Sequence, residues 1–220
     1  MRRVAEDVFQ IALTPRDGVN AYLMGDIVVD AGTPGAAKRL IKALQGHPVG
    51  AHALTHAHAD HAGGSKRLVD AFDVPVWVGE RDRADVESGH PARADSWARP
   101  LLDRFARYEP VPVARMLREG DELGHGFVVL EVPGHSAGHV AFWREADRTL
   151  VAGDVFFNLH MLTTVHGLRE PPRALTPDPA RNRDSARRLA ALDPALTLFG
   201  HGPPLRDPAA LKAFADGLPS

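Results

Sequence analysis

Four potential metal ligands lie within six residues of one another in the segment THAHADH, residues 55–61. Three are imidazoles and one is a carboxylate: His56, His58, Asp60 and His61. His56 and His58 are two residues apart, so an extended backbone directs both side chains to one side. The small residues that surround Asp60 and His61 allow the turn that these two need. Four donor groups this close exceed the needs of one tetrahedral ion, which predicts two adjacent metal ions.

Three further candidate ligands, His135, Asp154 and His201, each follow an apolar run and lie beside a glycine that leaves room for an ion. Loops at strand ends are where a rigid sheet presents functional groups. A lone histidine after a strand is usually an ordinary surface or core residue. Several candidates at successive strand ends, each next to a glycine, instead favour a metal site.

The composition restricts the chemistry. The 220 residues include twelve histidines and no cysteine, so the ligands must be imidazole nitrogens and carboxylate oxygens, which suit zinc, iron or manganese. A net charge of −2 without blocks of like charge argues against binding to nucleic acid or to an anionic membrane. No apolar run approaches the roughly 20 residues that span a bilayer, and no apolar leader follows the first arginines, so we expect a cytoplasmic protein.

Apolar runs and turn signals predict the elements that must position these residues. Strands are expected at residues 4–13, 20–29, 49–56, 74–79, 127–132, 139–143, 149–152 and 195–200. Helices are expected after the GTPG segment at 32–35, at 65–72, at 176–192 and in the last dozen residues. In both halves of the chain, groups of predicted strands are separated by predicted helices, which favours two sheets with helices on their outer faces.

The chain is expected to form a single domain, residues 1–220, with a helical insertion around 80–118. This segment is polar and broken by prolines, but Trp97, Leu101, Leu102 and Phe105 have the spacing of one amphipathic helix. Together with the loop 155–173, the insertion would form the walls of a substrate pocket. The candidate pocket residues are Phe156, Phe157, His160 and Met161, with Arg169 and Arg173 as candidate partners of a substrate carboxylate.

The motifs THAHADH, PGHSAGH (133–139), AGD (152–154) and FGHG (199–202) resemble the successive motifs of the metallo-β-lactamase superfamily over nearly the whole chain. The resemblance implies an α/β fold, the αββα four-layer sandwich, with a dinuclear site on one edge. His56, His58 and His135 would hold the first metal, Asp60, His61 and His201 the second, and Asp154 would bridge them. Asp30, in the segment VDAG (29–32), and His139 would orient these ligands without binding the metals themselves.

Within the superfamily, the sequence is most similar to the glyoxalase II-like group, with the quorum-lactone hydrolases beside it. β-Lactamases of this fold lack the bridging carboxylate and often use a cysteine ligand, and the diiron oxygen-reducing branch has Glu in place of His58. Two features depart from the nearest groups. Only 19 residues follow His201, whereas glyoxalase II binds glutathione through a longer helical region. Lactonases have a tyrosine shortly after the bridging aspartate, but here Val155, Phe156 and Phe157 follow Asp154.

The expected function is a metal-dependent hydrolase with two divalent ions, zinc in the first place and iron or manganese as alternatives. It would cleave a thioester or an ester/lactone bond of a small molecule with a metal-bridged hydroxide. Asp60 and Asp154 are the expected catalytic carboxylates. Two alternatives stay open: a persulfide dioxygenase with one iron on His56, His135 and Asp154, and a metal-stabilised scaffold without catalysis. A homodimer is also left open.

Overall fold

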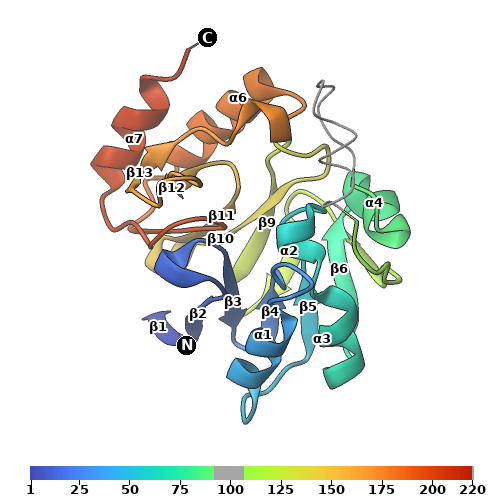
Figure 1. The fold of residues 1–220 in the computed structure, drawn as a ribbon. Coiled ribbons are helices and arrows are strands. Elements are labelled where there is room, and N and C mark those ends of the chain that lie inside the picture. Colours follow the sequence, from blue (N-terminus) through green and yellow to red (C-terminus); the bar gives the residue numbers. More distant parts are fainter. Residues whose placement is uncertain (92–106, 220) are drawn as a thin grey trace.

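Two sheets form the centre of this computed structural model, which describes residues 1–91 and 107–219 (Figure 1). The first sheet has seven strands in chain order: β1 (Arg2–Ala5), β2 (Val8–Ala12), β3 (Asn20–Met24), β4 (Ile27–Val29), β5 (Ala51–Ala53), β6 (Val76–Gly79) and β7 (Arg115–Leu117). The second sheet has the order β14 (Leu196–Phe199), β11 (Thr149–Gly153), β10 (Val140–Arg144), β9 (Phe127–Glu131) and β8 (Glu122–Gly124). A separate hairpin pairs β12 (Phe157–Leu159) with β13 (His166–Arg169).

Strand direction changes within each sheet. Strands β1 to β4 pair antiparallel, whereas β4, β5, β6 and β7 pair parallel. In the second sheet, only the β11–β14 pair is parallel, and the other pairs are antiparallel. Because the carboxyl ends of neighbouring parallel strands meet at one edge of a sheet, β4 and β5, like β11 and β14, present their following loops side by side.

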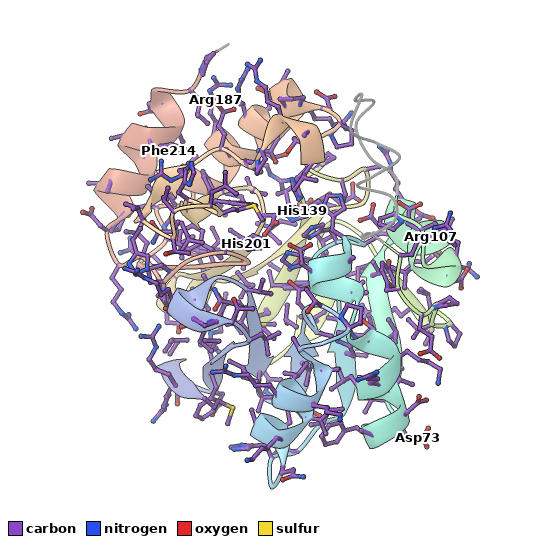
Figure 2. All side chains as sticks on the ribbon, in the orientation of Figure 1. Asp73, Arg107, His139, Arg187, His201 and Phe214 are labelled. Atoms are coloured by element: carbon purple, nitrogen blue, oxygen red, sulfur yellow. The ribbon has the colours of Figure 1, made fainter. Side chains whose placement is uncertain are left out.

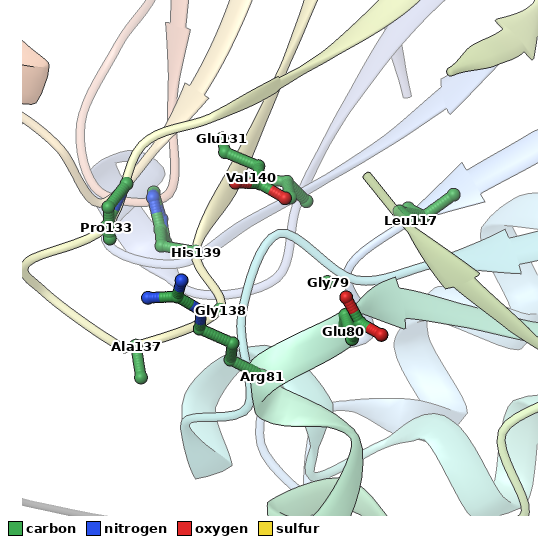
Figure 3. Close-up of a pocket in the computed structure, with 10 residues that line it drawn as sticks. All are labelled: Gly79, Glu80, Arg81, Leu117, Glu131, Pro133, Ala137, Gly138, His139 and Val140. Atoms are coloured by element: carbon green, nitrogen blue, oxygen red, sulfur yellow. The ribbon is translucent and has the colours of Figure 1, made fainter. Parts of the chain in front are cut away.

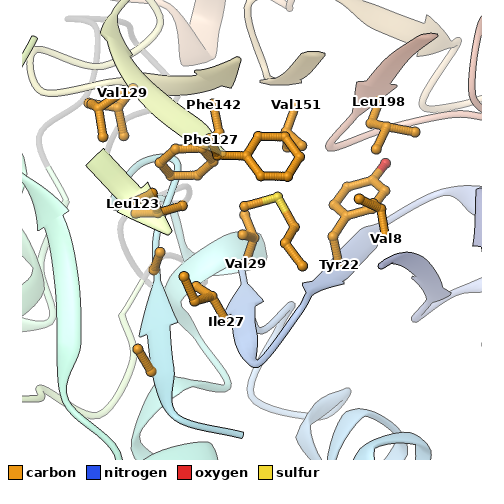
Figure 4. Packing of buried hydrophobic residues seen from close by; sticks show 14 of the residues in the cluster. Val8, Tyr22, Ile27, Val29, Leu123, Phe127, Val129, Phe142, Val151 and Leu198 are labelled. Atoms are coloured by element: carbon orange, nitrogen blue, oxygen red, sulfur yellow. The ribbon is translucent and has the colours of Figure 1, made fainter. Parts of the chain in front are cut away.

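The main core lies between the two sheets (Figure 4). Tyr22 and Val29 of the first sheet face Phe127, Phe142 and Leu198 of the second, and all five side chains are buried. Side chains alternate along each strand, so apolar side chains on the outer face of each sheet must also be buried. Helices bury them.

Helices cover both outer faces and make the structure a four-layer αββα sandwich. The first sheet carries α1 (Ala37–Leu44) and α3 (Ser65–Phe72), with the short helices α2 (Ala59–Ala62) and α4 (Arg83–Ser88) nearby, and the second carries α6 (Pro179–Ala190) and α7 (Pro208–Asp216). Asp178 and Asp207 cap α6 and α7 by accepting hydrogen bonds from backbone N–H groups in the first turn. The fold class expected from the sequence is confirmed.

Several segments differ from the sequence prediction. The strand expected at 4–13 is divided into β1 and β2, which pair antiparallel. The strand expected at 49–56 ends at Ala53, and the Thr55 N–H bonds to the side chain of Asp30 rather than to a neighbouring strand. The segment 155–173, predicted as a loop, contains the β12–β13 hairpin. Within the predicted insertion, α4 and β7 are formed, while the four residues that suggested the amphipathic helix lie outside the described residues.

No helix in the described parts of the chain has the length and apolar character needed to cross a membrane. The described helices are short and amphipathic instead. Each buries one face against a sheet, as in α1, where Ala37, Leu40 and Leu44 are buried.

His52 on β5 connects the first sheet to α3 in a way that depends on pH. Its Nδ1–H donates to the Val28 carbonyl at 3.1 Å, and its Nε2 accepts from the Ser65 hydroxyl at 2.8 Å. Burial lowers the pKa of His52 below its usual value of 6.5. The neutral imidazole therefore satisfies both partners, whereas a protonated ring would be a buried charge.

We expect His52→Gln to weaken the pH dependence of stability in the acid range. A depressed folded-state pKa means that the unfolded chain binds the proton more readily, so His52 destabilises the fold as pH falls below about 6.5. The difference in unfolding free energy between wild type and variant should shrink by up to about 1.4 kcal/mol per pH unit between pH 7 and 5. Urea unfolding at several pH values measures it. A difference that stays constant over this range would contradict the neutral, buried imidazole.

Candidate metal centre

The candidate ligands follow strands whose carboxyl ends meet at one edge of the sandwich. His56 comes after β5, Asp154 directly after β11, and His201 two residues after β14. The parallel register pairs Gly153 with Phe199, which brings Asp154 next to the loop of His201. Gly200 is necessary for this approach, because a Cβ atom there would collide with the Asp154 carboxylate and the His61 ring. Figure 2 shows His139 and His201 near the centre of the molecule, where the two halves of the chain meet.

Asp154 lies at the centre of the cluster. Its Oδ2 is 3.1 Å from His201 Nε2, 3.3 Å from His61 Nε2, 3.4 Å from His135 Nε2 and 3.9 Å from His56 Nε2. His58 Nδ1 lies 3.0 Å from His135 Nε2. Asp60 Oδ2 is 3.3 Å from His201 Nε2 and 4.0 Å from His61 Nε2. One carboxylate therefore faces imidazoles from all the candidate motifs.

These groups form three sets in which the donor atoms all lie within 4.8 Å of one another. The sets are His56, His58 and His135; His56, His61 and Asp154; and Asp60, His61 and His201. The structure thus brings together all seven residues that the sequence analysis selected as candidate ligands. The first and third sets share no residue, and Asp154 reaches both.

The donor set fits metal ions because its inward atoms have no other partner. Nε2 of His56, His61 and His201 and Oδ1 of Asp154 are fully buried without a hydrogen bond. Buried polar atoms in proteins are nearly always hydrogen-bonded, and several converging exceptions are what a metal site presents when only protein atoms are considered. Imidazole and carboxylate donors of this kind suit divalent zinc, iron or manganese.

The outward nitrogens of His56, His135 and His201 are fixed by the protein. Nδ1–H of His56 donates to Thr55 Oγ1 at 3.0 Å, and that of His135 to Thr176 Oγ1 at 3.1 Å. His201 Nδ1–H donates to the Gly18 carbonyl at 2.6 Å. Such contacts select the tautomer that leaves Nε2 free to bind a metal, and they hold the plane of the ring.

The candidate supporting residues Asp30 and His139 lie directly behind the cluster. Asp30 accepts a 2.8 Å hydrogen bond from His61 Nδ1–H, and both of its carboxylate oxygens face the hydroxyl of Thr55, which in turn contacts His56. His139 Nε2 accepts the backbone N–H of Asp154 at 3.1 Å, and its ring centroid lies 4.8 Å from that of His56. Asp30 thus contacts an imidazole, whereas His139 holds the loop that carries the central carboxylate.

The electrostatics of the cluster differ between its two ends. Burial lowers the pKa of His56 and His135 well below the usual value, so both are neutral. Burial also acts on His201, but the carboxylates of Asp154 and Asp60 outweigh it and raise its pKa to about 10. The pKa of His61 is raised for the same reason. Metal binding by the third set must therefore displace protons, whereas the first set is already deprotonated.

Comparison with known proteins agrees with this geometry. A sequence model of the metallo-β-lactamase superfamily matches residues 14–201, which is most of the chain. The chain belongs to the metallo-β-lactamase superfamily. The match includes every one of the seven candidate ligands.

Relatives in the superfamily match different shares of the chain. It is 29% identical over 204 residues to "Probable metallo-hydrolase YflN" of Bacillus subtilis, covering 81% of this chain and 76% of the relative. It is 32% identical over 136 residues to the hydroxyacylglutathione hydrolase of Bdellovibrio bacteriovorus, covering 60% of this chain and 44% of that enzyme. Among solved structures, a di-iron-bound form of TTHA1623 is 33% identical, with a TM-score of 0.67 and coverage of 90% of this chain and 94% of the other.

The candidate substrate residues on the segment after Asp154 point in different directions. Phe157 packs beside the metal centre, with its ring centroid 4.4 Å from that of His201 and 6.3 Å from that of His135. Phe156 instead lies in the core between the second sheet and the helices, 6.2 Å from Phe214. The prediction that Phe156 lines the substrate pocket is therefore wrong, because adjacent side chains alternate across the chain.

The remaining four candidates lie on or after the β12–β13 hairpin. His160 is half-buried and accepts the Thr163 N–H, and Met161 is exposed at the tip. Arg169 lies on β13 and is half-buried, whereas Arg173 is exposed in the following turn. The structure thus places Phe157 in contact with candidate ligands, and it distributes the others along the hairpin.

Asp82 is a residue of the site that the sequence analysis missed. It follows β6, is buried, and accepts hydrogen bonds from Ala57 N at 3.0 Å and from Ser136 Oγ and Gly138 N at 2.6 Å each. Burial raises its pKa above the usual value. Asp82 thereby joins the loop of His56 and His58 to the loop of His135. Like Asp30, it is an aspartate at the end of a strand, which is the signal that could have found it.

The backbone after β6 lies close to the backbone of the His135 loop. Figure 3 shows Gly79, Glu80 and Arg81 at the end of β6, facing Gly138 and His139 across a small hollow. A Cβ atom on Gly79 would collide with the Gly138 carbonyl, and one on Gly138 would collide with the Asp82 backbone. The two loops are therefore held by backbone packing as well as by the carboxylate.

We expect Asp82→Asn to weaken metal binding by the first set of ligands about 10–100-fold, the range typical when a group that orients ligands is lost. The amide would direct N–H donors at groups that are themselves donors, so at least one of the three hydrogen bonds is lost. Competition with a chromogenic chelator measures the affinity. Asp73→Asn is the matched control, because Asp73 is exposed at the end of α3, far from His139 (Figure 2). Equal affinities in both variants would show that Asp82 does not position the ligands.

Proposed function

We propose that this protein is a metal-dependent hydrolase that cleaves thioesters in preference to esters or lactones. The proposal rests on the convergence of seven donor residues with Asp154 at their centre, in a fold whose relatives include a probable metallo-hydrolase and a hydroxyacylglutathione hydrolase. Two divalent ions, most simply zinc, held by His56, His58 and His135 and by Asp60, His61 and His201, would activate a shared water near neutral pH and polarise the substrate carbonyl.

Asp60 is suited to handle the proton of the attacking water. Its side chain is about a third exposed, in contrast to the buried Asp154, so it borders the space that a substrate must enter. The neighbouring His61 and His201 outweigh the effect of burial and lower the pKa of Asp60, which keeps it ionised. An ionised carboxylate at this place would orient the water and accept its proton as the tetrahedral intermediate collapses.

The observation that carries the preference for thioesters is the position of the two tyrosines. The Tyr22 hydroxyl donates to the Phe199 carbonyl and the Tyr108 hydroxyl to the Ala57 carbonyl, each at 2.7 Å. Both phenols are buried, and burial raises their pKa. Neither tyrosine is free to protonate a leaving alkoxide, and Phe157 lies beside the site instead. A thiolate leaves without protonation, since its pKa is far lower than that of an alcohol.

Initial rates on a panel of substrates test this function. The panel contains an acyl-CoA-type thioester, S-lactoylglutathione, a homoserine lactone, a phosphodiester and a β-lactam, all with protein of measured metal content. The two thioesters should be cleaved faster than the lactone, and the β-lactam should be inert. A phosphodiester cleaved faster than every carbonyl substrate would contradict acyl transfer. Oxygen uptake with a persulfide and one iron per chain would favour the dioxygenase instead.

A further inference from the structure

The β12–β13 hairpin presents one face to the metal centre and the other to the protein core. Phe157 on β12 contacts the rings of His135 and His201. Leu168 on β13 packs against the core that lies under α6 and α7. Asn158, the next residue on β12, donates to the Pro203 carbonyl at 2.8 Å. The two strands pair at Phe157 with Arg169 and at Leu159 with His166, so the facing of Arg169 follows from its pairing with Phe157.

Arg169 shares the face of Phe157. The antiparallel register pairs Phe157 directly with Arg169, and directly opposite residues in such a pair project to the same side. The guanidinium also lies beside Gly167, where a Cβ atom would come within 3.8 Å of Arg169 Nη2. Arg169 therefore extends beside the ring that contacts the candidate ligands.

Arg169 lacks an anionic partner within residues 1–91 and 107–219. Its Nε is fully buried and makes no hydrogen bond, and no carboxylate lies within 4.0 Å of the guanidinium. The adjacent Glu170 is already engaged by Arg183 at 2.6 Å. A half-buried guanidinium without a partner is costly, and its planar set of donors matches a carboxylate.

We propose that Arg169 forms a subsite that binds a carboxylate of the substrate, so that the preferred thioesters are anionic. This inference deepens the proposed function and rests on it for the reaction, but the binding of a carboxylate to Arg169 can be tested separately. The carboxylate can belong to the acyl group or to the thiol of the substrate. In either case it would bind the guanidinium of Arg169.

Three thioesters of similar length separate these cases: pentanoyl-N-acetylcysteamine, which is neutral, glutaryl-N-acetylcysteamine, with the carboxylate on the acyl group, and pentanoyl-3-mercaptopropionate, with the carboxylate on the thiol. Wild type should have a kcat/KM at least tenfold higher for one carboxylate-bearing thioester than for the neutral one, a factor that one charge-assisted hydrogen bond can supply. In Arg169→Gln this ratio should fall to about one. Arg148→Gln, at an exposed arginine paired with Asp193, should keep the wild-type ratio.

A binding experiment decides the subsite independently of the reaction. Calorimetry on metal-loaded protein compares 3-mercaptopropionate with 2-mercaptoethanol, which lacks the carboxylate. Wild type should bind 3-mercaptopropionate at least tenfold more tightly, and Arg169→Gln should bind both thiols equally. If no thioester is cleaved but this difference is present, the proposed function fails and the subsite stands. If wild type does not distinguish the two thiols, or if Arg169→Gln still does, the subsite is wrong.

Discussion

Asp154→Ala is expected to abolish hydrolysis while it leaves the fold largely intact. The Asp154 carboxylate lies within 4.0 Å of four imidazoles from three motifs, so its loss removes the group that contacts both the first and the third set of ligands. Metal activation contributes several kcal/mol to such reactions, which corresponds to a loss of about three orders of magnitude in rate. The fold should persist, because the two sheets and their helices are held by apolar cores that exclude this residue.

Initial rates and elemental analysis of the same samples measure this effect. Asp184→Ala is the control, since Asp184 is an exposed aspartate on α6. It should retain both metal content and rate. An Asp154→Ala protein that holds two ions per chain and cleaves thioesters at the wild-type rate would contradict the bridging position.

His135→Ala and His139→Ala should differ strongly, although the two histidines lie in one short motif. His135 Nε2 lies 3.0 Å from His58 Nδ1 and 3.4 Å from Asp154, so its loss removes one of three donors from the first set. The rate should again fall by about three orders of magnitude. His139 accepts a backbone N–H instead, and its loss should weaken metal binding about 10–100-fold.

The pair is compared at saturating metal, where the two roles separate. His139→Ala should recover most of its rate when metal is in excess, whereas His135→Ala should not. Circular dichroism of both variants checks that the fold is retained. If His139 proves essential and His135 dispensable, the assignment of the ligand within PGHSAGH is wrong.

The sequence was sufficient for the candidate ligands because each of their motifs follows a strand. The apolar runs that end at residues 152 and 200 predict strands, and polar residues just after them must emerge at a sheet edge. The structure places the carboxyl ends of β11 and β14 together through a parallel pairing. The order of the motifs therefore predicted which residues converge, although not the distances between them.

Contacts between distant segments could not be predicted in the same way. Asp82 accepts hydrogen bonds from backbone N–H groups 25 and 56 residues away. Every residue except proline has such a group, so the pattern of residue types in the sequence does not indicate these partners. The side chains of the neighbours Phe156 and Phe157 point to opposite sides, and a shift of one residue after Asp154 would exchange them. The sequence does not show which of the two faces the candidate ligands. The hairpin that carries Arg169 contains a bulge between its two paired positions, so it lacks the clean alternation that indicates a strand.

Titration of metal into chelator-treated protein, followed by the rate of thioester hydrolysis, tests the central claim most directly. The seven convergent donors, with Asp154 as the proposed bridging carboxylate, predict that the rate rises until two equivalents of zinc are bound per chain and then stays constant. The same rate should be obtained without oxygen. A rate that saturates at one equivalent, or hydrolysis that persists in metal-free protein, would contradict a dinuclear hydrolase.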